Sequence, residues 1–202
     1  MPIVFTGFGA PVTLDLNGHT VTTDVPGYGD NRVVGQYGLI LRDGSAVTIK
    51  DSSEGKNGAF VSTWSTAYLD SGSSLTLESG RVQGLGKGDG SGVISTSGQG
   101  DKVTLNIKGG ELVIAGTASP YQPASGYCAF MKNADVIMSG GVLRADGDKD
   151  KVQSDDGAYA RGIRGMSDTT IQVTGGEFQN FKGPAEEGHG EGLRRQVVRL
   201  CK

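Results

Sequence analysis

Leu75-Thr-Leu77-Glu-Ser-Gly80-Arg-Val82 is the stretch that decides the fold, because the chain contains it several times. Two apolar residues flank a polar one, a small pair with glycine follows, and another apolar residue closes the motif. Further copies are Leu105-Asn-Ile107-Lys-Gly-Gly110-Glu-Leu112, Val136-Ile-Met138-Ser-Gly-Gly141-Val-Leu143 and Ile171-Gln-Val173-Thr-Gly-Gly176-Glu-Phe178. Degenerate copies precede them at Leu14-Asp-Leu16-Asn-Gly18 and Val47-Thr-Ile49. The copies start at residues 14, 47, 75, 105, 136 and 171, and a period of this length is typical of stacked structural units.

Each repeat also carries a second apolar segment before the motif. These segments are Gly38-Leu39-Ile40-Leu41, Ala67-Tyr68-Leu69, Gly92-Val93-Ile94, Cys128-Ala129-Phe130 and Gly162-Ile163. Short runs rich in Asp, Gly, Ser and Asn connect them to the motif, and these are turn-forming residues. Each repeat therefore predicts three short strands separated by two tight bends and followed by a longer loop.

Three short strands per repeat, with no helical period between them, predict a parallel β-helix in which each strand pairs with its counterpart one repeat away. Alternation places Leu75, Leu77 and Val82 inside and Thr76 and Glu78 outside. The rival structure is an antiparallel β-sandwich, whose strands are also short and bounded by glycine. A sandwich gives no reason for one motif to return at near-constant intervals, so we expect an all-β solenoid of about six turns.

The longer loops follow the third strand of each repeat. They are expected at Asp24–Gly35, Gly84–Ser91, Ala115–Gly126 and Ala145–Ala158, with Asp51–Thr66 filling the same interval. Loops at one position of the repeat leave from one edge of the solenoid, which is where solenoids usually carry their binding surface.

The repeat pattern predicts one β-helix domain over residues 1–180. Residues 1–11 lie outside the repeat, and they either cap the first turn or are the remainder of an upstream repeat. Residues 181–202 are expected to form a loop followed by a short amphipathic capping helix or a disordered tail. Leu193, Val197, Leu200 and Cys201 have the helical spacing, and a helix of about ten residues forms only if it is docked.

Composition limits the function classes. Glycine supplies 35 of the 202 residues without a triplet period, which excludes collagen. The net charge of −3 gives no reason to expect a nucleic-acid partner, and no apolar run is long enough to insert into a membrane. Residues 1–11 lack the basic start and sustained apolar run of a signal peptide. Cys128 and Cys201 make neither a disulfide framework nor a metal-ligand cluster.

The stretch Val12-Thr-Leu-Asp-Leu-Asn-Gly-His-Thr-Val-Thr22 and the later Gly-Gly motifs resemble the right-handed parallel β-helix (pectin-lyase-like) repeats of bacterial surface and secreted proteins. The resemblance covers residues 12–180. It implies a right-handed coil in an extracellular or cell-surface part of a larger polypeptide. It is specific for fold and weak for function, because adhesin-like proteins, phage tailspikes and polysaccharide-degrading enzymes all carry such repeats.

Enzymes of this fold supply the catalytic alternative, a polysaccharide lyase or glycoside hydrolase. Polygalacturonase-like enzymes use an Asp-Asp pair and a Gly-His-Gly motif, and this chain has Asp155-Asp156 and Gly188-His189-Gly190. The third acidic motif and the following basic motif are absent, and the histidine lies outside the repeats. Lyase chemistry needs an arginine base, for which Arg161 and Arg164 are the candidates. Hydrolysis needs two carboxylates at a controlled separation, which neighbouring loop residues do not indicate.

A calcium site is the weaker alternative to the expectation that no cofactor is bound. Asp146, Asp148 and Asp150 are spaced like the start of a calcium-binding loop. Lys151 occupies the position of the loop glycine, and Gly157 occupies that of the closing glutamate. A solvated, turn-forming loop explains these residues better.

Aromatic residues gather near the start of the second apolar segment and in the loops that lead to it. They are Trp64, Tyr68, Tyr121, Tyr127 and Tyr159, with Tyr37 at the equivalent place in an earlier repeat. Rings in a row along one edge can form a platform for sugar rings. A row of tyrosines that only packs the corner of the coil is the competing interpretation.

Together these patterns favour a non-catalytic extracellular module with a structural or adhesive role. If it binds a ligand, we expect a polysaccharide or a cell-surface glycan on the aromatic edge. A lyase or hydrolase and a plain spacer of a larger surface protein remain the alternatives.

Overall fold

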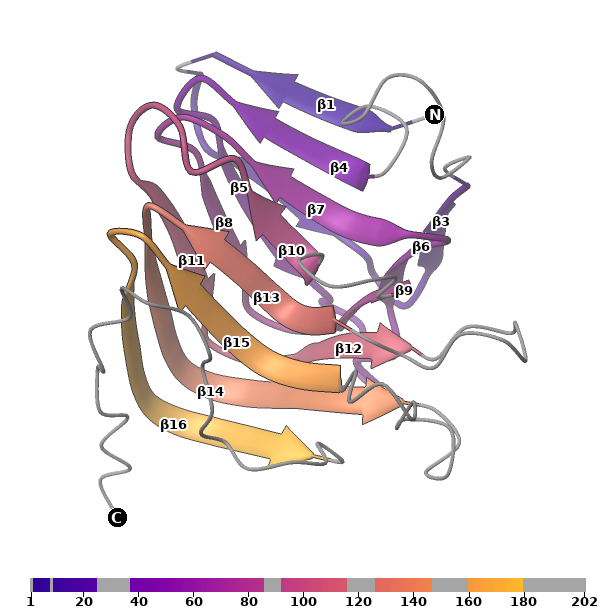
Figure 1. Cartoon of the computed structure of the whole chain (residues 1–202). Coiled ribbons are helices and arrows are strands. Elements are labelled where there is room, and N and C mark those ends of the chain that lie inside the picture. Colours follow the sequence, from indigo (N-terminus) through magenta and orange to yellow (C-terminus); the bar gives the residue numbers. More distant parts are fainter. Residues whose placement is uncertain are drawn as a thin grey trace.

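The computed structural model describes residues 2–7, 9–24, 37–85, 92–115, 126–146 and 160–179, which form an all-β parallel solenoid (Figure 1). Strands follow one another along the chain, and each lies beside its counterpart from the next repeat. No helix in this described part of the chain is long and apolar enough to cross a bilayer.

The strands occupy three positions in each turn. The first position forms a six-stranded sheet, in the order β1 (Ile3–Thr6), β4 (Tyr37–Arg42), β7 (Ser65–Leu69), β10 (Gly92–Thr96), β13 (Gly126–Lys132) and β15 (Ala160–Met166). The second position holds β2 (Val12–Asp15), β5 (Ala46–Lys50), β8 (Ser74–Leu77) and β11 (Val103–Ile107). The third holds β3 (Thr20–Thr23), β6 (Ala59–Ser62), β9 (Arg81–Leu85) and β12 (Glu111–Ala115).

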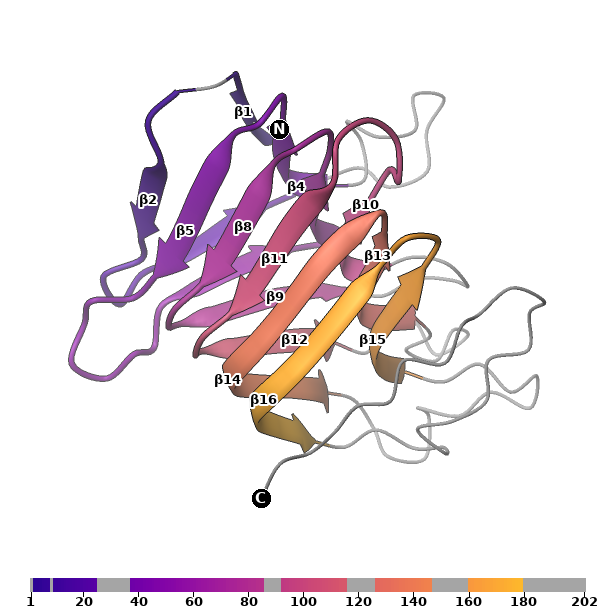
Figure 2. The ribbon, with the colours of Figure 1, turned by 90° about the vertical axis from the view of Figure 1, so that its left-hand side faces the viewer.

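The regular part of the solenoid has about four turns rather than the predicted six. The strands β1 to β12 make these turns, with three separate strands in each. The stack then continues with β14 (Ala134–Asp146) and β16 (Thr170–Gln179), each of which runs through the second and third positions as one bent strand (Figure 2). β14 pairs with β11 along its first half and with β12 along its second. Its ladder of hydrogen bonds therefore resumes directly after the corner.

Parallel register aligns the equivalent residues of successive motifs. Leu105 lies beside Leu75 on one side and Val136 on the other, and Val136 lies beside Ile171. The prediction that these four positions are neighbours is confirmed. Leu75 and Leu105 are fully buried in one continuous hydrophobic cluster, so every second residue of the short strands feeds a shared interior.

The Gly-Gly part of the motif forms the corner between the second and third strands. The corner glycines, with φ values between 70° and 101°, are Gly80, Gly110, Gly141 and Gly176. At two successive corners the residue after the corner donates its N–H to the corner carbonyl one turn earlier: Glu111 to Gly80 at 2.8 Å and Val142 to Gly110 at 2.9 Å. The motif therefore returns because each turn must bend where the previous one bends.

One predicted loop is placed differently by the structure. Residues 51–66 were expected to follow a third strand, but they contain the third strand β6 itself. The long connection is residues 51–58, at the corner between β5 and β6. Most corners need only a short bend. The corner at residues 51–58 can hold a longer loop because hydrogen bonds between its polar groups stabilise it, as described below.

The two ends of the chain are described to different extents. Residues 3–6 of the N-terminal segment form β1, which pairs with β4 in parallel and so belongs to the six-stranded sheet. Residues 181–202, with the expected capping helix, lie outside the described residues. So do most of the expected long loops, at 25–36, 86–91, 116–125 and 147–159, and each of these intervals joins a third strand to the next first strand.

Candidate functional site

The outer face of the six-stranded sheet carries aromatic and basic side chains. Register places Ile40, Tyr68, Ser95, Phe130 and Arg164 in one row across five strands. None of these residues belongs to the interior hydrophobic cluster, whereas the preceding residues in the first four strands, from Leu39 to Ala129, do. The row therefore points away from the interior.

One group on this face, the Tyr68 patch, consists of Tyr37, Arg42, Tyr68, Asp70 and Ser97. The half-buried ring of Tyr68 lies 4.9 Å from the ring of Tyr37 between centroids, with the planes tilted by 44°. The Ser97 hydroxyl donates to Asp70 Oδ1 at 2.6 Å. Among the described residues Arg42 Nε is buried and has no hydrogen-bond partner. The patch thus combines a supported aromatic ring with donors and acceptors.

The surroundings of Tyr68 disfavour its ionised form. Burial raises the pKa of the Tyr68 hydroxyl, and the negative charge of Asp70 adds to the increase. A hydrogen bond with Ser97 and the positive charge of Arg42 act in the opposite direction on this pKa. Tyr68 therefore stays a neutral phenol that can donate and accept hydrogen bonds.

A second group, the Arg164 cluster, consists of Tyr127, Phe130, Lys132 and Arg164. Arg164 Nη1 donates to the Tyr127 hydroxyl at 2.6 Å, and the guanidinium carbon lies 5.3 Å from the Tyr127 ring centroid and 5.6 Å from that of Phe130. Lys132 Nζ lies 5.3 Å from the Phe130 centroid. Cations over ring faces at these distances are attracted to them. Arg164 therefore helps to hold the rings in place, and both rings are at least 93 % buried.

The predicted ligand-binding residues divide between the described and the undescribed parts of the chain. Tyr68 and Tyr127 lie on the outer face of the six-stranded sheet, and Trp64 is half-buried in the short link between β6 and β7. Tyr121 and Tyr159 lie outside the described residues. The structure therefore places Tyr68 and Tyr127 on one face, two strands apart, in separate groups.

The catalytic alternative stays a prediction. Asp155 and Asp156 lie outside the described residues, and of Arg161 only the place within β15 is described. Arg164, the other basic candidate, is committed to Tyr127 and Phe130 as described above.

The weak metal prediction also stays untested as a set, because Asp148 and Asp150 lie outside the described residues. Asp146 accepts two hydrogen bonds from Arg144, at 2.8 Å from Nε and 3.1 Å from Nη2. Arg144 also pairs with Glu111 at 3.0 Å, which is one turn earlier. Within the described ranges no three His, Cys, Asp or Glu side chains gather in a way that could hold a metal ion.

Cys128 is a buried residue of the interior. Burial raises the pKa of its thiol to about 12, and the sulfur donates weakly to the Leu112 carbonyl at 3.5 Å. A thiol that stays protonated is a poor nucleophile, so Cys128 packs as a small apolar side chain.

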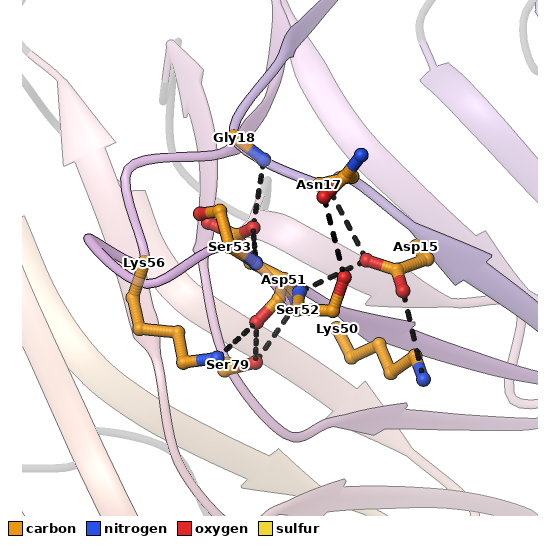
Figure 3. A network of polar contacts seen from close by, with 9 residues as sticks. All are labelled: Asp15, Asn17, Gly18, Lys50, Asp51, Ser52, Ser53, Lys56 and Ser79. Carbon is orange, nitrogen blue, oxygen red and sulfur yellow. Dashed lines mark hydrogen bonds and ion pairs between the residues drawn. The ribbon is translucent and has the colours of Figure 1, made fainter.

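A third polar group, the Asp51 corner, joins three turns where β2, β5 and β8 end (Figure 3). Asp51 is 1 % exposed, and its carboxylate accepts three backbone N–H groups: those of Gly18 at 2.8 Å, Ser53 at 3.1 Å and Gly58 at 2.5 Å. The Asp51 N–H donates to Ser79 Oγ at 2.8 Å, and its carbonyl accepts from Lys56 Nζ at 2.8 Å. One side chain therefore organises the loop at residues 51–58.

Asp15 supports the same corner from the first turn. Its Oδ1 accepts the N–H groups of Ser52 at 2.9 Å and Asn17 at 3.1 Å, and its Oδ2 lies 3.6 Å from Lys50 Nζ. The N–H of Ser52 is the principal cause of a lowered Asp15 pKa. At this corner two aspartates accept hydrogen bonds from main-chain N–H groups, so the role of Asp15 and Asp51 is structural.

Hydrogen bonding keeps Asp51 ionised in spite of its burial. Burial acts to raise the pKa of the Asp51 carboxyl, but the hydrogen bonds from Ser53, Gly58 and Gly18 outweigh it and lower the pKa from 3.8 to about 2. A carboxyl with a lower pKa in the folded than in the unfolded chain stabilises the fold above the unfolded pKa. That contribution is lost as the pH falls through the folded pKa.

We therefore expect the contribution of Asp51 to stability to disappear between about pH 4 and pH 2. The Asp51→Asn variant should be less stable than the native chain at neutral pH, because an amide cannot accept all three N–H groups. The urea midpoints of the native chain and of Asp51→Asn should converge as the pH falls through this range. Ser79→Ala, which removes two neutral hydrogen bonds with the Asp51 main chain, should show a loss of stability that does not change with pH. A difference in urea midpoint between Asp51→Asn and the native chain that stays constant from about pH 4 to about pH 2 would contradict the assignment.

The sequence signalled some of these residues and not others. Phe130 is the last of three consecutive apolar residues in the sequence, yet it lies in the outward row. Asp51 was seen only as the start of a loop. Its partners Gly18 and Gly58 follow asparagine in the sequence, and Asn-Gly is a turn signal that marks both places without revealing that they meet.

Comparisons of the chain with protein-family models, with curated proteins and with solved structures found no significant match. The assignment as a parallel β-solenoid therefore depends on the strand order and register described above.

Proposed function

We propose that this chain is a non-catalytic structural and adhesive module that binds glycan through the Tyr68 patch. The observation that carries the proposal is the half-buried ring of Tyr68, which packs against Tyr37 at 4.9 Å between centroids and is influenced by Arg42, Asp70 and Ser97. A sugar ring offers an apolar face with hydroxyl groups at its rim. A supported aromatic ring with polar neighbours complements that pattern.

Asp70 adds a reason to expect a polar ligand here. Its negative charge acts on Tyr68, and its carboxylate can accept a hydrogen bond from a sugar hydroxyl. Trp64 precedes β7, the strand that carries Tyr68, and belongs to the same proposed surface.

The setting that we propose is extracellular or at a cell surface, within a larger polypeptide. The support is the resemblance to the repeats of bacterial surface and secreted proteins. A rigid rod of this kind presents a binding face at a fixed distance from whatever carries it.

An array of immobilised neutral and acidic polysaccharides tests the proposal, with calorimetry on the oligosaccharide that binds best. Tyr68→Ala is expected to weaken binding about tenfold or more, because it removes the stacking ring. Tyr68→Phe keeps the ring and should retain most of the affinity.

Ile137→Ala is the control, because Ile137 is 38 % exposed on the second-position sheet and far from the patch in the strand order. Its affinity should equal that of the native chain. Binding to no polysaccharide would favour the spacer interpretation, and release of shortened oligosaccharides would favour the enzyme. Equal affinity of Tyr68→Ala and the native chain would rule out the Tyr68 patch as the site.

A further inference from the structure

The sequence contains two Asn-Gly pairs, Asn17-Gly18 and Asn57-Gly58, and both meet at Asp51. The glycine nitrogen of each pair donates to the same carboxylate, Gly18 to Oδ1 at 2.8 Å and Gly58 to Oδ2 at 2.5 Å. Both asparagines are exposed, so water reaches them. Figure 3 shows the first of these contacts, between Gly18 and Asp51.

Asn-Gly pairs are chemically reactive in an unrestrained chain. The backbone nitrogen of the glycine attacks the side-chain carbonyl carbon of the asparagine and forms a five-membered succinimide. The bond from that carbon to the side-chain nitrogen breaks, and the nitrogen leaves as ammonia with the proton from the backbone N–H. Water then opens the ring at either carbonyl, which gives aspartate or isoaspartate. No other reactant is needed.

The contact with Asp51 opposes each requirement of the attack. The glycine nitrogen must lose its proton and turn towards the asparagine side chain. At this corner the proton lies between the nitrogen and a carboxylate oxygen. Turning the nitrogen away would remove one of the three main-chain donors of a nearly fully buried carboxylate, which is costly. The Asn17-Gly18 pair is held further by a tight turn, in which His19 N–H donates to the Leu16 carbonyl at 2.8 Å.

We propose that the Asp51 corner is a latent double modification site, in which one carboxylate prevents succinimide formation at both Asn17-Gly18 and Asn57-Gly58. Conversion of either asparagine would also add a carboxylate next to Asp51, and Asn17 lies near Asp15 as well. Like charges would then weaken the hydrogen bonds that hold the corner, so the first conversion would promote the second. The inference does not depend on glycan binding.

Peptide mapping by mass spectrometry tests the proposal on the full chain, incubated at neutral to mildly alkaline pH. In the native chain, conversion at residues 17 and 57 should be at least about tenfold slower than in the same chain unfolded in urea, because the reaction requires local opening. Asp51→Ala should accelerate both sites. Asp51→Asn has one side-chain oxygen, so it should release one glycine nitrogen and accelerate one site more than the other.

Asp15→Ala is the matched control, because Asp15 accepts hydrogen bonds at the same corner but from neither glycine nitrogen. It should leave conversion at residue 57 at the native rate. Circular dichroism shows whether each variant folds, and the comparison of native and urea-unfolded chains needs no variant. Equal rates in those two states, or equal acceleration at residue 57 by Asp15→Ala and Asp51→Ala, would overturn the proposal.

Discussion

Replacing Leu105 with alanine is expected to lower the free energy of unfolding by about 3–5 kcal/mol. Leu105 is fully buried in β11, between Leu75 of the preceding turn and Val136 of the following one. Removing its side chain opens a cavity that the neighbouring turns cannot fill, because each of them is tied to its own ladder of hydrogen bonds. Urea denaturation followed by circular dichroism measures the loss.

Ile137→Ala is the control for Leu105→Ala, because it removes a comparable aliphatic side chain from the opposite face. Ile137 directly follows Val136 and is 38 % exposed. Its loss should be under about 1 kcal/mol. Equal losses at both positions would mean that the alternation of inward and outward residues is not the one described.

The period of the motif predicted the fold because it reports a physical necessity. Each turn presents its interior residues and its corner to the turn above and the turn below, so the same residue types must return at the same places. Leu75, Leu105, Val136 and Ile171 were identified from sequence alone, and the structure aligns them. The number of regular turns was not predictable in the same way. Whether a corner interrupts a strand, or bends it as in β14, depends on hydrogen bonds between turns.

The outer face could be predicted only in part, because the alternation of inward and outward residues fails at the start of β10 and β13. Val93 and Ile94 are consecutive and both lie in the interior cluster, and so do Cys128 and Ala129. Two consecutive inward residues reverse the inward and outward positions of the residues that follow them in the strand. Phe130 therefore lies outside, beside Arg164, although its sequence neighbours suggest a continuous apolar run.

The partners of Asp51 were beyond sequence reasoning for a different reason. Gly18 is 33 residues away and Gly58 is seven, and only the stacking of turns brings both to one carboxylate. An aspartate followed by two serines is a turn signal in any protein. What makes Asp51 distinctive is that it satisfies several main-chain donors of a loop that would otherwise bury them unpaired.

Replacing Gly110 with alanine is expected to lower the free energy of unfolding by about 2–4 kcal/mol, for two separate reasons. Gly110 has φ = 70°, where an L-residue with a side chain is strained. A Cβ atom there would lie 2.5 Å from the Gly80 carbonyl oxygen and 3.0 Å from the Ser79 carbonyl carbon. Both atoms belong to the backbone of the preceding turn, so the corner stack itself would have to move.

Gly72→Ala separates these two reasons. Gly72 has the same φ of 70°, but the nearest atom to an added Cβ is the Asp101 Cβ at 3.4 Å, which is an ordinary contact. Gly72→Ala should therefore lower the free energy of unfolding by about 1 kcal/mol, through the backbone angle alone. The difference between the two variants, measured by urea denaturation, is therefore the free energy of close approach between successive turns. Equal losses would show that backbone angle alone places glycine in the motif, and that the corners do not stack as closely as the register requires.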